Sequence, residues 1–152
     1  AIGMEVIAWT YNPTDERAKA LGVTFKSMDE LLAESDVISV HVRLTEDSTH
    51  LIGTEQFAMM KPNSIFLNGA RGAVADTDAL VQALDSGHLM GAGIDVFEEE
   101  PTLADHPLFA CDHVVLTPHC ADMTPEGVDL LNGGAVDNVL AYLSGEPQNR
   151  VA

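Results

Sequence analysis

The sequence contains few cysteines and no long apolar run, and both shortages exclude classes of protein. Its 152 residues include only 2 cysteines, Cys111 and Cys120. Neither belongs to a CxxC pair or to a cysteine/histidine set with zinc spacing, so no metal site is expected. Disulfide-rich secreted domains are also excluded, and a reduced, cytoplasmic setting is expected. No apolar run approaches the roughly 18 residues that a membrane span requires.

Positive charge is also scarce. The chain has 7 Lys and Arg against 24 Asp and Glu, which gives a formal net charge of −17. Such a surface would repel nucleic acid and anionic membranes, so neither is an expected partner. A solvated acidic surface that favours solubility is the preferred explanation, and a specific basic partner is the alternative.

The remaining sequence alternates short runs rich in Val and Ile with amphipathic stretches, which is typical of βα units around a buried parallel sheet. We therefore predict a doubly wound, Rossmann-like α/β fold. The expected strands are 4–9, 23–25, 37–40, 64–67, 91–96 and 113–116, and the expected helices are 14–20, 28–34, 54–60 and 76–86.

Helix boundaries are indicated by local signals. Thr14 and Ser27 can cap the first turns of helices and are followed by acidic residues that suit the helix dipole. A longer helix is expected from Thr124 to about Leu143, with Gly145 after its end. We predict a partial nucleotide-binding domain over residues 1–122 and a C-terminal helix and tail over 123–152.

Three polar residues follow three of the expected strands. Arg71 comes after SIFLN, Glu100 after GAGIDVF, and His119 after VVLTP. The carboxyl ends of parallel strands share one edge, where ligands of open α/β sheets bind, so we expect these side chains to converge.

The three residue types suit the reduction of a 2-oxo acid. A guanidinium can bind a carboxylate in bidentate fashion, and an imidazole can transfer a proton near neutral pH. A neighbouring carboxylate would raise the pKa of that imidazole. Each residue also has a structural explanation: Arg71 could form a surface ion pair, Glu100 could face water, and His119 could serve packing alone.

At these residues the sequence resembles the D-isomer-specific 2-hydroxyacid dehydrogenase family, and the resemblance covers nearly the whole chain. It is carried by HVRLTEDSTHLIG at 41–53, MKPNSIFLNGARGAVADTDAL at 60–80, GAGIDVFEEEP at 91–101 and LTPH at 116–119. Several motifs in the same order make a strong signal.

The resemblance implies that Arg71 binds the substrate carboxylate, that His119 is the acid/base and that Glu100 is its partner. It also implies that Asp95 lies at the nicotinamide end of a dinucleotide cofactor. Further residues expected to contact the cofactor are His41, Val42, Arg43, Ser48 and, through their main chain, Gly69 and Ala70.

Two positions depart from the family pattern. Arg43 replaces a common proline, and Thr10, followed by Tyr11 and Asn12, stands where many members have an acidic residue. That acid would bind the adenosine ribose and reject a 2′-phosphate, so both NAD and NADP remain open and Thr10 and Asn12 are candidate contacts. Arg17 could reach a phosphate, although a position on a helix surface is the commoner case.

The glycine-rich phosphate loop GxGxxG does not occur in the sequence. Residues 1–4 resemble the end of the helix that follows such a loop, so we expect the first strand, the loop and the substrate domain to be missing from this chain. The chain alone is then expected to be inactive. Unpaired strand edges predict association or instability, and the family resemblance implies a homodimer through the nucleotide-binding domain.

We therefore predict an oxidoreductase that interconverts a D-2-hydroxy acid and a 2-oxo acid using NAD or NADP. Glyoxylate, hydroxypyruvate and phosphoglycerate-type substrates remain open. Two alternatives are a non-enzymatic, corepressor-like nucleotide sensor on the same scaffold and a flavodoxin-like domain that binds a metal ion through acidic residues. The second alternative leaves the NGARG and LTPH motifs unexplained.

Overall fold

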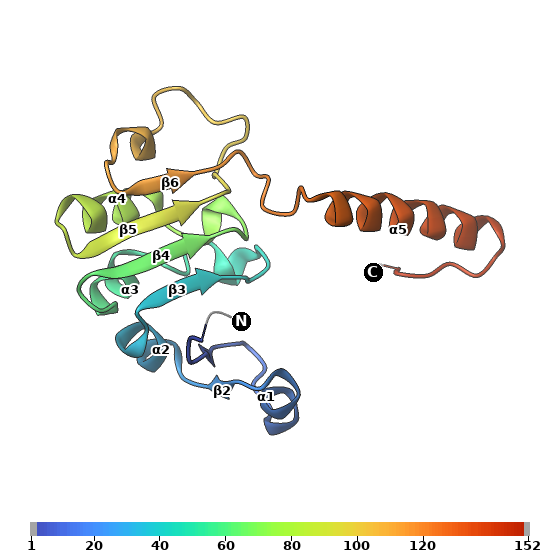
Figure 1. Cartoon of the computed structure of the whole chain (residues 1–152), viewed down its shortest axis with the longest axis horizontal. Helices are drawn as coiled ribbons and strands as arrows, with labels where there is room; N and C mark the ends of the chain where they lie inside the picture. Colours follow the sequence, from blue (N-terminus) through green and yellow to red (C-terminus); the bar gives the residue numbers. More distant parts are fainter. Residues whose placement is uncertain (1–2, 151–152) are drawn as a thin grey trace. The chain divides into compact units, whose positions relative to one another are not determined.

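The computed structural model of the chain describes residues 3–150. The chain forms two compact units, Ala1–His119 and Cys120–Ala152. The first unit contains a four-stranded sheet in the order β3-β4-β5-β6 and a separate pair, β1-β2 (Figure 1). All of these strand pairs are parallel, which confirms the parallel α/β class predicted from the sequence.

The order of the elements is that of successive βα units. The strands are β1 (Ile7–Ala8), β2 (Thr24–Phe25), β3 (Val37–Val40), β4 (Ser64–Asn68), β5 (Leu89–Ile94) and β6 (Val114–Leu116). The helices are α1 (Asp15–Leu21), α2 (Met28–Glu34), α3 (Thr54–Met59), α4 (Thr77–Asp85) and α5 (Pro125–Leu143), with 3-10 turns η1 (Glu46–Ser48), η2 (Gly72–Val74) and η3 (Pro107–Ala110).

Some strand bounds differ from the predicted ones because hydrogen-bonded partners, and not apolar runs, define a strand. The first was expected over 4–9, but only Ile7 and Ala8 pair with a neighbour, at Thr24 and Phe25. Residues 1–2 of the expected preceding helix lie outside the described residues, and Gly3 and Met4 are not helical. Strand β5 ends at Ile94, which pairs with the last residue of β4.

One face of the main sheet is packed against helices. Helices α2, α3 and α4 contact one another in sequence order, and α4 also contacts β5. Alternate strand residues, among them Ile38, Phe66 and Ile94, are buried on this face. The rings of Phe57 on α3 and Phe66 on β4 meet edge to face, with centroids 5.1 Å apart.

Side chains on the opposite face are less buried. Ile65 and Leu67 are only partly buried, and Val115 on β6 is 71% exposed. The apolar runs predicted burial on both faces. Within residues 3–119, however, helices α2, α3 and α4 bury only one face of the sheet. Buried and less buried residues accordingly alternate along β3 and β4.

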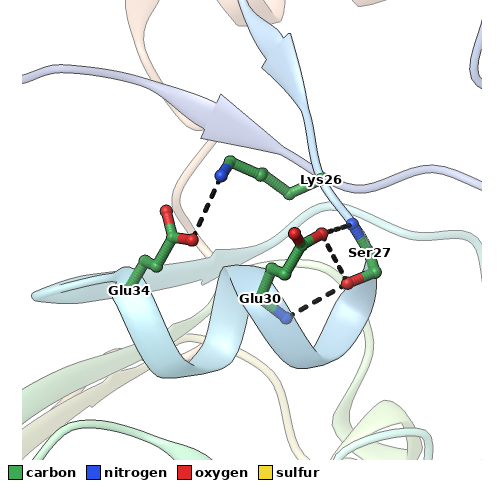
Figure 2. Close-up of polar contacts among 4 residues, drawn as sticks. All are labelled: Lys26, Ser27, Glu30 and Glu34. Atoms are coloured by element: carbon green, nitrogen blue, oxygen red, sulfur yellow. Dashed lines mark hydrogen bonds and ion pairs between the residues drawn. The ribbon is translucent and has the colours of Figure 1, made fainter.

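Helix α2 shows how local sequence fixes an element of the first unit. The Ser27 hydroxyl accepts a hydrogen bond from the Glu30 amide, and the Glu30 carboxylate accepts one from the Ser27 amide (Figure 2). This reciprocal capping box satisfies two amide groups that the first turn leaves free. Lys26 Nζ also lies 3.1 Å from Glu34 Oε1, so the preceding residue is tied to the last residue of the helix (Figure 2).

The second unit consists mainly of α5. Thr124 caps its first turn by accepting from the Gly127 amide, and Pro125 occupies the first position. None of its residues is buried, and Leu130 and Leu143 are 78% and 74% exposed. Among residues 3–150, no helix combines the length and the apolar character needed to cross a bilayer.

Candidate active site

The turn that carries Arg71 is held by the last residue of β4. Asn68 is 2% exposed, and its amide nitrogen donates to the Arg71 carbonyl at 3.0 Å. Its side-chain oxygen accepts from the Ala70 amide at 3.1 Å. The Arg71 guanidinium donates to the Ala70 carbonyl at 2.6 Å. Asn68 therefore fixes the backbone at the point where the arginine side chain leaves it.

Glu100 and His119 form a direct pair. His119 Nδ1 lies 2.7 Å from Glu100 Oε2, although 19 residues separate them in the chain. The other carboxylate oxygen, Oε1, accepts from the Phe97 amide at 2.9 Å. Both oxygens of Glu100 are thus occupied, and the carboxylate is oriented by the backbone that follows β5.

The backbone at His119 is held in an unusual conformation. Its φ is +52°, in the left-handed region that L residues adopt at a cost of about 1–2 kcal/mol. The His119 amide donates to the Asp95 carbonyl at 2.7 Å, which ties the segment after β6 to the end of β5. Such strain outside a glycine is a common feature of functional sites.

The pKa shifts of the pair agree in direction. The hydrogen bond to Glu100, and next the negative charge of that residue, raise the pKa of His119. The hydrogen bonds from His119 and from the Phe97 amide lower the pKa of Glu100. The positive charge of Arg71 contributes to the lowered pKa of Glu100 and opposes the rise in the pKa of His119. The pair therefore favours a charged imidazolium beside an ionised carboxylate.

The pair remains open to solvent. The side chain of His119 is 44% exposed and that of Glu100 is 36% exposed. A small ligand can therefore reach the imidazole without a change in the fold.

Asp95 lies just beyond β5, beside the residues of the pair. It is 7% exposed, and Thr117 Oγ1 donates to its Oδ1 at 2.5 Å. The position at the carboxyl end of a central strand is the one expected for Asp95, and it brings the residue to the same edge as Arg71, Glu100 and His119.

Four of the residues predicted to contact the cofactor line one large cavity. It has a volume of about 1210 Å³ and extends between β1 and β3, with Thr10, His41, Val42 and Arg43 in its wall. The cavity is lined along the whole of β1 and β3 and by Met28 and Leu31 of α2, and these four residues border the part of it beyond the carboxyl ends of the two strands.

The other predicted contacts lie elsewhere. Ser48 is fully buried and donates to the Arg43 carbonyl at 2.7 Å, so it holds the loop from inside. The Asn12 carbonyl accepts from Arg17 Nη1 at 2.5 Å. Gly69 and Ala70 follow β4, and a Cβ added at Gly69 would meet no atom within 4 Å.

Three supporting residues were missed by the sequence analysis: Asn68, Phe97 and Thr117. Signals for two of them were present. Asn68 stands three residues before Arg71 at a strand end, a spacing suited to a side chain that bonds its own turn. Thr117 stands two residues before His119. Phe97 acts through its backbone amide, for which the sequence carries no signal.

No group of three or more His, Cys, Asp or Glu residues that could hold a metal ion occurs within the described range 3–150. Cys111 and Cys120 are not joined by a disulfide.

Comparison with known proteins places this chain in a family. Residues 1–121 match the NAD binding domain of the D-isomer specific 2-hydroxyacid dehydrogenases. The chain is 42% identical to a glyoxylate reductase of Aeropyrum pernix over 152 residues, which are 99% of this chain and 45% of the relative. It is 49% identical to glyoxylate/hydroxypyruvate reductase B of Pectobacterium carotovorum over 119 residues, which are 78% of this chain and 37% of the relative.

Solved structures give the same result. A D-lactate dehydrogenase from Aquifex aeolicus, complexed with NAD and lactic acid, superposes with a TM-score of 0.82 at 35% identity, covering 95% of this chain and 47% of that one. The TT0316 protein from Thermus thermophilus superposes with a TM-score of 0.88 at 42% identity, covering 99% of this chain and 47% of that one.

The chain thus spans about half the length of the relatives it matches. The two reductases and the D-lactate dehydrogenase are named as oxidoreductases, so neither the corepressor-like nor the flavodoxin-like alternative gains support. The family match over residues 1–121 leads to one conclusion: the chain belongs to the D-isomer specific 2-hydroxyacid dehydrogenase family, within its NAD binding domain.

Proposed function

We propose that this chain supplies the cofactor-binding and proton-transfer part of an enzyme that interconverts a D-2-hydroxy acid and a 2-oxo acid. The proposal rests chiefly on one observation, the 2.7 Å contact between His119 Nδ1 and Glu100 Oε2 at the sheet edge where β4, which precedes Arg71, also ends. An imidazole held in this way keeps its proton to higher pH, and it has a cationic neighbour that can bind a carboxylate.

Each catalytic residue has a defined task in this proposal. Glu100 engages Nδ1 of His119, which leaves Nε2 as the nitrogen that faces substrate. In the reducing direction, Nε2 donates its proton to the oxygen of the 2-oxo group. In the oxidising direction it accepts the hydroxyl proton. Arg71 binds the substrate carboxylate, which replaces the Ala70 carbonyl as acceptor for the guanidinium.

The cofactor, when bound, supplies or accepts the hydride. Thr10, His41, Val42 and Arg43 would hold it from the cavity between β1 and β3. Ser48 would act by shaping the loop that carries Arg43. The remaining predicted contacts, Asn12, Gly69, Ala70 and Asp95, stay proposals from the family resemblance. Because Thr10 replaces an acid, NADP is proposed alongside NAD.

The names of the relatives favour glyoxylate and hydroxypyruvate as substrates to test first.

We also propose a homodimer formed through the nucleotide-binding domain and a cytoplasmic location. The low cysteine content, 2 residues in the sequence, suits a reducing compartment. Residues 123–152 are proposed to lead toward a substrate domain.

A chimera tests the catalytic assignment. This chain would replace the segment of the Aeropyrum pernix glyoxylate reductase that it matches over 152 residues, and glyoxylate-dependent oxidation of NADH and NADPH would be measured. His119→Asn and Arg71→Ala should each lower kcat/KM by roughly two to four powers of ten. His113→Asn is the matched control, because His113 is an exposed histidine just before β6, at the opposite end of that strand. A folded chimera that binds cofactor without turnover, or an active His119→Asn variant, would refute the proposal.

A further inference from the structure

The acidic run Glu98-Glu99-Glu100 contains a second residue with specific contacts. Glu98 Oε1 accepts from Thr77 Oγ1 at 3.1 Å and lies 3.8 Å from His50 Nε2. The other ring nitrogen of His50, Nδ1, lies 4.0 Å from Asp76 Oδ2. Glu98 therefore contacts the start of α4, whereas Glu100, two residues later, contacts His119.

The same segment touches the arginine-bearing turn through its backbone. A Cβ added to Gly72 would lie 2.0 Å from the Phe97 carbonyl carbon and 2.3 Å from the Glu98 nitrogen. The φ of Gly72 lies outside the left-handed region, so glycine is needed there only because a side chain would not fit. The backbone next to Arg71 thus packs directly on the backbone of Phe97 and Glu98.

These contacts form a continuous connection to the catalytic pair. Thr77 and His50 contact the Glu98 side chain, and Gly72 packs against the backbone of Phe97 and Glu98. The adjacent Phe97 amide donates to Glu100, which engages His119. Without these contacts, the Glu100 side chain on an exposed loop would sample several rotamers. Restricting it to one rotamer costs conformational entropy.

We propose that Glu98, anchored by Thr77 and His50 and with its backbone packed on Gly72, is a positioning residue that holds Glu100 against His119. As a statement about catalysis, this role rests on the proposed function. As a statement about the geometry of the pair, it can be tested without any turnover.

The first test follows the His119 ring by NMR during a pH titration of the full chain. Glu98→Ala and Thr77→Val should each lower the pKa of His119 by on the order of half a unit, because the carboxylate next to the ring becomes mobile. Thr77→Ser keeps the hydroxyl and should retain the wild-type pKa. Glu100→Gln, which removes the partner itself, should give a larger decrease.

Glu99→Ala is the matched control. It removes the same charge and the same side chain one position away, and Glu99 is exposed. It should leave the pKa of His119 nearly unchanged. Equal decreases for Glu98→Ala and Glu99→Ala would overturn the proposal, because loss of charge alone would then explain both. An unchanged pKa in a folded Thr77→Val variant would also overturn it.

The second test places the same variants in the chimera. Glu98→Ala and Thr77→Val should lower kcat about 5- to 20-fold and shift the pH profile to lower pH, with a smaller effect on cofactor affinity. If the unmutated chimera is inactive, the proposed function fails, yet the NMR comparison still decides whether Glu98 positions the pair. If the chimera is active but Glu98→Ala leaves its pH profile in place, the positioning role fails and the proposed function stands.

Discussion

At the residue scale, the raised pKa of His119 comes chiefly from its contact with Glu100. The hydrogen bond to Glu100 raises the pKa of His119, so the stability that this contact contributes is present at lower pH and is lost as pH rises through the raised pKa. The pKa of Glu100 is lowered, so its contribution is lost as pH falls through that lowered value. Between these two limits, the pair is an imidazolium beside a carboxylate.

The pH range in which His119 and Glu100 are both charged predicts the pH dependence of the proposed reaction. Reduction of a 2-oxo acid needs protonated His119, so kcat/KM in the reducing direction should fall as pH rises through its pKa. Glu100→Gln should move that fall to lower pH. Oxidation of the hydroxy acid should show the opposite trend, since His119 must then accept a proton. Steady-state rates of the chimera in both directions would check this, and coinciding profiles for the unmutated chimera and its Glu100→Gln variant would contradict it.

Gly72 provides a second prediction at this scale. Gly72→Ala forces a Cβ into the backbone of Phe97 and Glu98, so the free energy of unfolding should fall by about 1–3 kcal/mol. Gly69→Ala is the matched control three residues earlier in the same turn, where a Cβ would meet nothing within 4 Å. Urea denaturation of both variants compares them. Equal losses of stability would show that backbone freedom, and not the close contact, accounts for the effect.

At the scale of elements, the clearest prediction concerns the start of α2. Ser27→Ala removes the acceptor for the Glu30 amide and should lower the free energy of unfolding by about 1 kcal/mol. Ser35→Ala, at the other end of the same helix, removes a hydroxyl that caps nothing through its side chain, so it should change stability by less than about 0.5 kcal/mol. Thermal unfolding followed by circular dichroism would measure both.

Elements that depend on local chemistry were predictable from the sequence. The range 28–34 was correct because Ser27 and Glu30 carry the cap within four residues. The bounds of β1 and β5 were displaced because partner strands distant in sequence set them. The site also combines residues indicated by local sequence with contacts set by tertiary packing. Strand ends indicated Arg71, Glu100 and His119, whereas the contacts of Glu98 with Thr77 and His50 depend on tertiary packing that no short motif encodes.

At the scale of the whole molecule, exposed apolar surface predicts association. Val115 on β6 is 71% exposed, and Leu130, Leu131 and Leu143 on α5 are at least 70% exposed. Monomers rarely leave so many large apolar side chains in water. Light scattering should therefore detect species larger than one chain, in proportions that rise with concentration. A stable monomer across a wide concentration range would contradict both this expectation and the proposed homodimer.

The net charge gives a further prediction for the whole chain. With 24 acidic and 7 basic side chains, the folded state concentrates a charge of −17, and Lys26 and Lys61 are among the few cations that pair with acids. Salt should relieve this repulsion, since the Debye length falls from about 30 Å at 0.01 M to about 10 Å at 0.1 M. A gain of about 1 kcal/mol would raise Tm by roughly 2–4 °C in a chain of this size.

Calorimetry in increasing NaCl distinguishes this effect from a general strengthening of apolar burial. Screening acts mainly while the Debye length exceeds the spacing of surface charges, so the rise in Tm should level off above about 0.15 M. Strengthened burial by excluded salts would instead continue to grow with concentration. A Tm that is constant at low salt would mean that the acidic side chains are far enough apart to be independent, and the charge would then affect encounters with other molecules more than folding.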